Sequence, residues 1–235
     1  MFSLFNTPSW FNDYDLVFNV ITFLITFLVT AYSYKIYKIS KERKYAYFSL
    51  SFLLISFAFI LKIVLLAVSS YSSPNQLADY TLSPITGGSV VYGDLLYRAA
   101  YFLHMASTLG AWLLIFFISQ KSRARLSKFY EVAQIALFIY LITLISVVSS
   151  FKYTVFYLTA AVILGMIVLN YYKNYLNKKR NMNAFLVMVA FLLILLGQFF
   201  FIFVFISNTL YLFGELSLLI GFLLIFYVYR KVVNK

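Results

Sequence analysis

The feature that most constrains this chain is the recurrence of long apolar stretches separated by short polar links. A helix rises 1.5 Å per residue, so about 20 residues cross the roughly 30 Å hydrocarbon core of a bilayer. Seven stretches of that length or slightly more lie at residues 15–36, 46–70, 95–119, 129–149, 152–172, 183–206 and 209–230. The sequence therefore predicts an all-α integral membrane protein, with a single seven-helix transmembrane domain over residues 1–235.

Composition supports lipid as the solvent of this chain. Hydrophobic residues make up 63% of the sequence and charged residues only 11%, whereas soluble domains are roughly a quarter charged. Cysteine is absent, which excludes disulfides, thiolate catalysis and iron–sulfur clusters. Residues 1–14 contain no Lys or Arg, so we expect no cleavable signal peptide and a first helix that inserts with its N-terminus outward.

The basic residues predict the orientation. Of the 19 Lys and Arg residues, 16 lie in alternate links and in the C-terminal tail, as in residues 35–44, 121–128, 173–180 and 230–235. Because cytoplasmic loops are enriched in Lys and Arg, this places the N-terminus outside and the C-terminus in the cytoplasm of a multi-pass cell-membrane protein. The net charge of +12 then indicates contact with the lipid bilayer and its anionic head groups at the cytoplasmic face. Nucleic-acid binding is not expected, because no basic domain exists to perform it.

Four strongly polar side chains interrupt the predicted helices. They lie about 9 to 13 Å below the predicted outer ends, and they are Lys62, His104, Gln198 and Glu215. Small and hydroxyl residues share their helix faces, and such residues mark contacts between helices rather than lipid. The sequence therefore predicts one polar layer in the outer half of the bundle.

The expected arrangement of this layer is a buried ion pair between Lys62 and Glu215, with His104 and Gln198 as hydrogen-bond partners. A purely structural interpretation also remains for each residue. Lys62 can extend toward the outer interface, His104 can be a satisfied interhelical hydrogen-bonding group, and Gln198 can serve only to hold neighbouring helices together. The ion pair can also serve only to fix which helices meet.

The predicted topology resembles that of microbial rhodopsins and G-protein-coupled receptors, but the residues differ. The last helix, LYLFGELSLLIGFLLIFYVYR, has no lysine before its predicted cytoplasmic end, so retinal and other cofactors are not expected. The stretches YFSLSFLLISFAFILK (47–62) and YRAAYFLHMASTLGAWLLIF (97–116) resemble segments of small uncharacterised archaeal-type seven-helix membrane proteins. That resemblance implies a seven-helix fold and no particular activity.

Enzyme and metal chemistry are not expected from this sequence. The chain has one His and no Cys, too few for the metal sites of seven-helix amidases or for bis-histidine haem. We expect a sensor or receptor-like bundle with a polar site in its outer half and a separate protein as output partner. Two alternatives remain: a small transporter or proton-coupled carrier that uses Glu215, and a structural subunit of a membrane complex.

Overall fold

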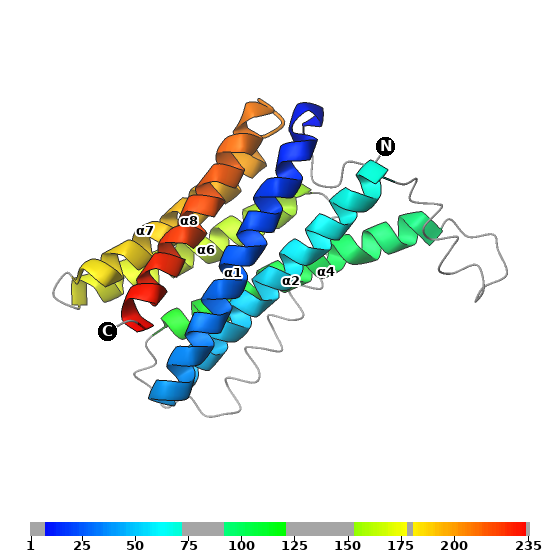
Figure 1. Cartoon of the computed structure of the whole chain (residues 1–235). Helices are drawn as coiled ribbons and strands as arrows, with labels where there is room; N and C mark the ends of the chain where they lie inside the picture. Colours follow the sequence, from blue (N-terminus) through cyan, green and yellow to red (C-terminus); the bar gives the residue numbers. More distant parts are fainter. Residues whose placement is uncertain (1–7, 72–91, 121–152, 178–180, 234–235) are drawn as a thin grey trace, which may run out of the picture.

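The computed structural model describes residues 8–71, 92–120, 153–177 and 181–233 (Figure 1). This part of the chain is helical, with six helices long and apolar enough to cross a membrane. They follow the short 3₁₀ helix η1 (Ser9–Phe11), and they are α1 (Asn12–Ser40), α2 (Arg43–Tyr71), α4 (Tyr92–Ser119), α6 (Tyr153–Asn177), α7 (Met182–Ile202) and α8 (Thr209–Val233). The helix expected at 129–149 lies outside the described residues.

The predicted sixth stretch, 183–206, extends too far at its C-terminal end. Helix α7 ends at Ile202, and Phe203 begins a turn in which the Ile206 N–H donates to the Phe203 carbonyl at 2.9 Å. The residues of this turn are as apolar as those of the helix, so hydropathy does not reveal the change. Residues 203–208 form the link to α8, which is longer than the single Asn208 suggested.

The six described helices form a closed ring in chain order. Each helix packs against the next described helix along the chain, and α1 packs against α8 to close the ring (Figure 1). Neighbouring helices in such a ring can present side chains to a common interior. The ring thus provides the geometry in which polar residues from several helices can meet.

Helix directions define two ends of the ring. The residues that lie together at one end include Ile36, Lys44, Ser119, Asn181 and Val232, which line a common cavity. Helices α1, α4, α6 and α8 therefore run toward this end, while α2 and α7 run away from it. Because α4 and α6 run in the same direction, the C-terminal end of α4 and the N-terminal end of α6 lie at opposite ends of the bundle.

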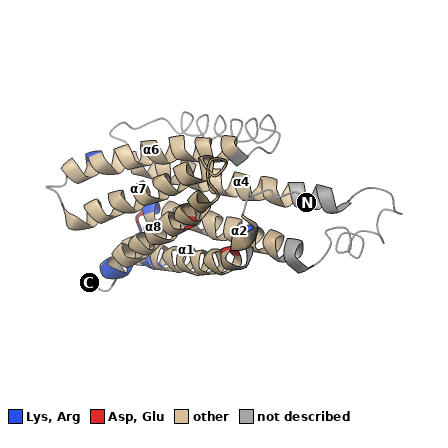
Figure 2. Cartoon of the chain, turned by 90° about the horizontal axis from the view of Figure 1, so that it is seen from above, with Lys and Arg blue, Asp and Glu red and all other residues tan. Residues whose placement is uncertain are grey.

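One end of the bundle is strongly basic, and we call it the basic end. Figure 2 shows most of the blue Lys and Arg segments toward the C-terminal end of the bundle. The basic residues of this end, among those described, are Lys35, Lys38, Lys41, Arg43, Lys44, Lys173, Arg230 and Lys231. Glu42, which pairs with Lys44, is the one acid there within the same described segments. We call the opposite end the Lys62 end.

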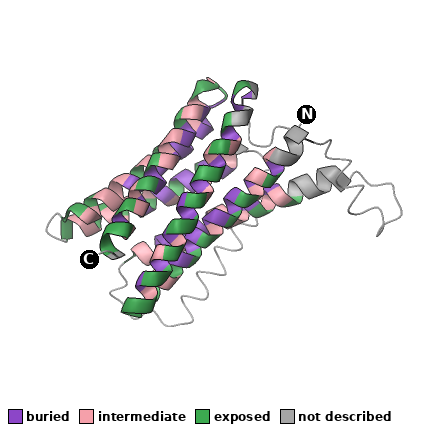
Figure 3. Cartoon of the chain, viewed as in Figure 1, coloured by how far each residue is buried: buried purple, intermediate pink, exposed green. Residues whose placement is uncertain are grey.

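Burial follows the helix faces in a pattern suited to lipid. Figure 3 shows buried positions on the inner helix faces and exposed positions on the outer ones. The exposed faces carry large apolar side chains such as Leu24, Phe27 and Leu196. A water-soluble protein does not normally expose apolar side chains along the whole length of its helices, so the outer surface is suited to contact with acyl chains.

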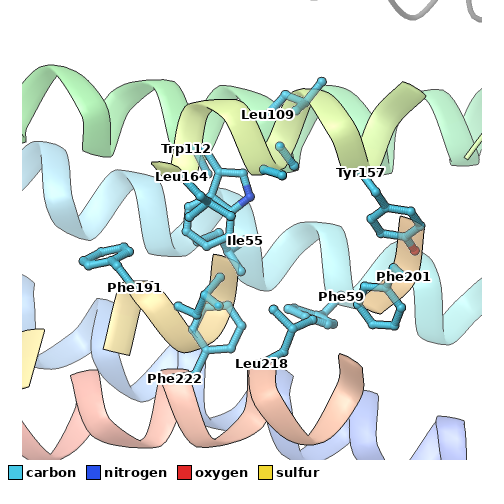
Figure 4. Close-up of a cluster of buried hydrophobic side chains, with 14 of the residues drawn as sticks. Ile55, Phe59, Leu109, Trp112, Tyr157, Leu164, Phe191, Phe201, Leu218 and Phe222 are labelled. Atoms are coloured by element: carbon cyan, nitrogen blue, oxygen red, sulfur yellow. The ribbon is translucent and has the colours of Figure 1, made fainter. Parts of the chain in front are cut away.

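Aromatic residues fill the interior (Figure 4). The indole of Trp112 on α4 stacks on the ring of Phe222 on α8, with an interplanar angle of 8° and centroids 6.3 Å apart. The rings of Tyr157 and Phe201 stack in the same way nearer the Lys62 end, with centroids 4.9 Å apart. Offset stacking of this kind adds about 0.5–1.5 kcal/mol beyond the burial itself.

Helices α7 and α8 approach each other closely at small residues, as expected from the sequence. A Cβ atom on Gly197 would lie 3.0 Å from the backbone oxygen of Gly214. A Cβ atom on Gly221 would lie 2.9 Å from the backbone oxygen of Ala190 and 2.6 Å from a side-chain carbon of Ile194. Small residues on facing helices let backbones pack together in membranes. This contact sets the position of Gln198 relative to Glu215.

Candidate functional site

Lys62 forms the centre of a buried charged group near one end of the ring. Its Nζ atom lies 2.8 Å from Glu215 Oε1 on α8 and 3.4 Å from Asp15 Oδ1 on α1. The three side chains are nearly inaccessible: Lys62 is 4%, Glu215 1% and Asp15 0% exposed. The ion pair expected between Lys62 and Glu215 is present, and Lys62 does not extend to the surface of the bundle.

Asp15 is the residue that sequence reasoning missed. It is the first residue of the predicted stretch 15–36, where a helix position lies at the edge of the membrane rather than in its interior. In the structure α1 begins at Asn12, which brings Asp15 into the helix and onto its inner face. Its Oδ1 accepts a hydrogen bond from Asn19 Nδ2 at 2.7 Å, and its Oδ2 accepts one from the Tyr211 hydroxyl at 2.9 Å. Asp15 is thus a second buried acid within the described helices, beside Glu215.

Tyr211 completes the group by joining α8 to both other helices. Its hydroxyl accepts a hydrogen bond from Lys62 Nζ at 3.1 Å while donating to Asp15. The ring of Phe11, from η1, packs edge-on against the Tyr211 ring with centroids 5.6 Å apart. We call Asp15, Lys62, Tyr211 and Glu215 the Lys62 cluster. Its members come from α1, α2 and α8, so it fixes the relative positions of these three helices.

A signal for Asp15 was present in the sequence. Polar residues recur along α1 at spacings of four, three, four and seven, and all are buried; they are Asp15, Asn19, Thr22, Thr26 and Ser33. Residues at such spacings share one helix face. The face is in contact with α2, since Ser56 Oγ donates to Thr26 Oγ1 at 3.0 Å. This polar stripe places Asp15 on the inner face of its helix.

A small central cavity adjoins the Lys62 cluster. It is lined by residues of α2, α4, α6, α7 and α8, and these include all four sequence-predicted residues, Lys62, His104, Gln198 and Glu215. The space open to a water-sized sphere is about 40 Å³. One water needs about 10–15 Å³ by this measure, so the cavity has room for a few water-sized occupants.

Three buried polar atoms in the cavity wall have no hydrogen-bond partner among the described residues. They are Trp112 Nε1, Gln198 Oε1 and Glu215 Oε2. The indole N–H is a donor, the amide oxygen is an acceptor, and a carboxyl oxygen accepts when ionised or donates when protonated. Buried polar groups are nearly always partnered by protein or by ordered water. The cavity wall therefore suits a polar occupant with both donor and acceptor capacity.

His104 lies in the cavity wall but does not pair with the charged residues in the way expected. Its Nδ1 lies 2.8 Å from the Ala58 carbonyl oxygen of α2, and since a carbonyl can only accept, Nδ1 carries the hydrogen. The ring also packs beside Phe156, with centroids 5.9 Å apart. The interhelical hydrogen-bond interpretation of His104 therefore describes this contact better than direct pairing with Glu215.

Gln198 likewise reaches the cavity without a bond to the Lys62–Glu215 pair. Its side chain is 4% exposed, and its Oε1 is one of the three unpartnered atoms. The expectation that it partners the ion pair directly is wrong for that atom. The reason is geometric: α7 is held against α8 at Gly197, so the neighbouring Gln198 faces the cavity between the helices.

A second, larger cavity lies at the basic end. It offers about 360 Å³ to a water-sized sphere and is lined by the ends of all six described helices. Its walls combine apolar side chains such as Ile36 and Val187 with Lys44 and the amides of Asn174 and Asn181. Cavities of roughly 300–1,000 Å³ are typical of small-molecule sites, so this one is large enough for an organic group.

Neither cavity is a metal site within the described segments. No group of three His, Cys, Asp or Glu side chains in them is arranged to hold a metal ion. Comparisons with protein-family models, with curated proteins and with solved structures find no match for this chain. The function of this chain has to be inferred from the chemistry of the site itself.

Proposed function

We propose that this chain is a multi-pass membrane sensor or receptor-like bundle that binds a small polar species in the central cavity. The observation that carries this proposal is the set of three unpartnered polar atoms around one cavity. In lipid an unsatisfied polar group is expensive, and three around one space favour an occupant over coincidence. A purely structural ion pair needs no such space.

The size of the cavity limits the bound species. Drug-sized ligands occupy several hundred Å³, whereas this space is about 40 Å³. The species is therefore a proton, a water-borne small ion or a molecule of a few heavy atoms. Binding that engages α4, α7 and α8 together stabilises one arrangement of these helices relative to others. A bundle without catalytic groups can report a ligand through such a population shift.

The seven-helix topology forms part of this proposal. Helices α4 and α6 run in the same direction, so the chain between Ser119 and Tyr153 has to return across the bundle. The apolar stretch 129–149 is long enough to do so. With seven crossings and the basic end in the cytoplasm, the N-terminus and the Lys62 cluster lie toward the outside.

Single thiols test this topology on a background free of native cysteine. We expect Ser40→Cys and Asn181→Cys to be protected from an impermeant maleimide added to intact cells, and Asn208→Cys to be labelled. Positions 40, 181 and 208 are exposed in the structure, so labelling reports the side of the membrane. If positions 40 and 181 label from opposite sides, the number of crossings between them is odd and the seven-helix topology is wrong.

Gln198→Met tests whether the central cavity holds a polar occupant, because its effect on the free energy of unfolding has opposite signs in an occupied and in a dry cavity. If an occupant bonds to Gln198, the change is expected to lower the free energy of unfolding by about 1 kcal/mol. If the cavity is dry, removing an unsatisfied buried amide raises stability. The measurement is unfolding in bicelles by titration with dodecyl sulfate.

A matched control gives the scale for this comparison. Asn170 is a second amide within a helix, and its Nδ2 donates to Ser119 Oγ at 2.9 Å. Asn170→Leu removes a partnered amide far from the central cavity. The resulting decrease in the free energy of unfolding gives the contribution of one such hydrogen bond in this bundle. A Gln198→Met variant more stable than the parent chain would contradict the proposed binding site.

The output partner is proposed to dock at the basic end. The cavity there is open to a group of organic size and has Lys44 in its wall, and eight described cations lie at this end of the bundle against Glu42. This combination suits a protein segment with an apolar anchor and flanking acids, because complementary charge favours encounter and fixes register. Anionic lipid head groups satisfy the exposed cations when no partner is bound.

A proton-coupled carrier is the second candidate, and the Lys62 cluster favours it through its two acids and one cation. The described helices are continuous, whereas carriers often break helices at the substrate site, so the sensor is preferred. Flux of a small species into proteoliposomes, abolished by Glu215→Gln, would favour the carrier. Binding without flux would favour the sensor.

A further inference from the structure

We infer that the cavity at the basic end is a second binding site, and that it takes a soluble organic anion built like a nucleotide. Such a molecule joins a flat ring with hydrogen-bonding edges to a phosphate. The observation that carries this inference is the convergence of aromatic, amide and cationic side chains on one space of about 360 Å³. The inference goes beyond the proposed function, because it makes no use of the central cavity.

The walls of this cavity suit a flat ring. Three tyrosines, Tyr45, Tyr171 and Tyr229, line it together with apolar side chains of α1, α4, α7 and α8. The Tyr229 ring stacks on Phe48 with centroids 4.8 Å apart, and the Tyr171 ring stacks on Phe191 with centroids 5.0 Å apart. Because these contacts already restrict the rings, a ligand that packs on them orders little more of the protein. Aromatic side chains are also the surfaces on which nucleobases stack.

Polar groups for the edges of a ring come from three asparagines of the cavity wall. They are Asn174 of α6, Asn181 at the N-cap of α7, and Asn183 in its first turn. A side-chain amide both donates and accepts hydrogen bonds, as the edge of a nucleobase does. The Oδ1 atom of Asn174 is buried and has no hydrogen-bond partner among the described residues. The wall therefore offers an acceptor to an N–H or O–H group of the ligand.

The charge of the basic end favours an anion. Of the described helices, four end at this cavity and two begin there. At about half an elementary charge for each helix end, the backbone contributes roughly one negative charge in total. The described side chains of this end contribute eight cations against Glu42, so they outweigh the helix ends several times over. Lys44 is the described cation that lines the cavity itself.

Lys44 is positioned to exchange its present partner for a phosphate. Its Nζ atom pairs with Glu42 Oε2 and lies 4.8 Å from the centroid of the Tyr45 ring. Both side chains of the ion pair are 55% exposed, and exposed pairs of this kind contribute little to stability. A phosphate carries roughly two negative charges and more acceptor oxygens than a carboxylate. Glu42 is therefore a weak competitor for the ligand.

The position of the cavity favours a soluble ligand over a membrane lipid. Its wall consists of the ends of the six described helices, each packed against the next described helix in the ring. The apolar side chains suited to acyl chains lie on the outer faces of the same helices. The cavity is thus reached from the water at the basic end. An occupant would also compete with the apolar anchor of the proposed output partner.

The test is the binding of three probes to the full-length protein in nanodiscs of zwitterionic lipid, measured by titration calorimetry. Adenosine monophosphate carries both ring and phosphate, adenosine lacks the phosphate, and ribose 5-phosphate lacks the ring. Adenosine monophosphate is expected to bind at least about tenfold more tightly than either of the others, because each of them leaves part of the cavity unfilled. Equal binding of adenosine monophosphate and ribose 5-phosphate would reveal attraction to surface charge alone and overturn the inference. No binding of adenosine monophosphate would overturn it as well.

Three variants locate the site. Lys44→Met is expected to weaken binding of adenosine monophosphate at least about tenfold through loss of a charge-assisted contact. Lys38→Met is the matched control, because its Nζ lies over the ring of the exposed Tyr34 and outside the cavity wall; a change below about twofold is expected. Glu42→Gln is expected to strengthen binding by releasing Lys44. Equal losses in Lys38→Met and Lys44→Met would contradict a site in this cavity.

An anionic lipid provides the last comparison. If phosphatidylglycerol co-purifies with the parent chain but not with Lys44→Met, and adenosine monophosphate does not displace it, the cavity holds a lipid head group and the inference is wrong. Displacement of the lipid by adenosine monophosphate would support the inference. Neither outcome bears on the central cavity, whose occupancy Gln198→Met tests separately.

Discussion

Lys62→Met is expected to lower the free energy of unfolding by about 3–5 kcal/mol, the usual cost of removing one partner from a buried ion pair. Methionine keeps the length and apolar volume of the side chain, so the loss comes from charge and hydrogen bonding. Asp15, Tyr211 and Glu215 all lose a contact with the Nζ atom at once. Reversible unfolding in bicelles gives the number.

Two further variants identify the origin of this loss. Lys38→Met, at an exposed cation of the basic end, is expected to change stability by less than about 0.5 kcal/mol. The double variant Lys62→Met with Glu215→Leu is expected to be more stable than the sum of the single losses, because each single change leaves the other group unpaired. Strict additivity would mean that Lys62 and Glu215 do not interact.

Gly221→Ala is expected to cost about 2–3 kcal/mol, the second largest effect. The added Cβ would lie 2.6 Å from Ile194 Cγ1 and 2.9 Å from the backbone oxygen of Ala190. A side chain can rotate away, but a backbone oxygen moves only if α7 and α8 separate. The same change should therefore also disturb Gln198 and Glu215, which lie on these two helices.

Gly165→Ala on α6 is the matched control for this prediction. Nothing lies within 4 Å of the Cβ position at Gly165, and alanine favours a helix over glycine by up to about 1 kcal/mol. The identical substitution is thus expected to stabilise the protein at one glycine and destabilise it at the other. Equal effects at both positions would mean that α7 and α8 are not packed closely at Gly221.

The layer of polar residues could be predicted from the sequence because the depth of a residue in the membrane follows from its position along its helix. The depth of Lys62 or Glu215 follows from counting residues along a helix of known rise, and helices in sequential contact bring such residues together. The partner of His104 was not predictable in this way. It is the backbone carbonyl of Ala58, and every residue carries such a group, so no pattern in the sequence singles it out.

Two predictions fail at helix ends, where the limits of an apolar stretch differ from the limits of the helix. Asp15 is the first residue of the predicted stretch 15–36 and was not placed in the interior, although four further buried polar residues follow it along one face of α1. Conversely, Phe203 and Ile206 were included in a helix because they are apolar, although the backbone turns there. In both places local hydrogen bonds decide the boundary, and composition does not report them.

The stacking of Trp112 on Phe222 at the wall of the central cavity gives the molecule its own fluorescent reporter. The chain has two tryptophans, and the other, Trp10, is half-exposed near the Lys62 end. With Trp10 replaced by Phe, all indole emission would originate beside the central cavity. Changes in wavelength or quenching would then follow occupancy in real time, without a dye, a radiolabel or knowledge of the downstream protein.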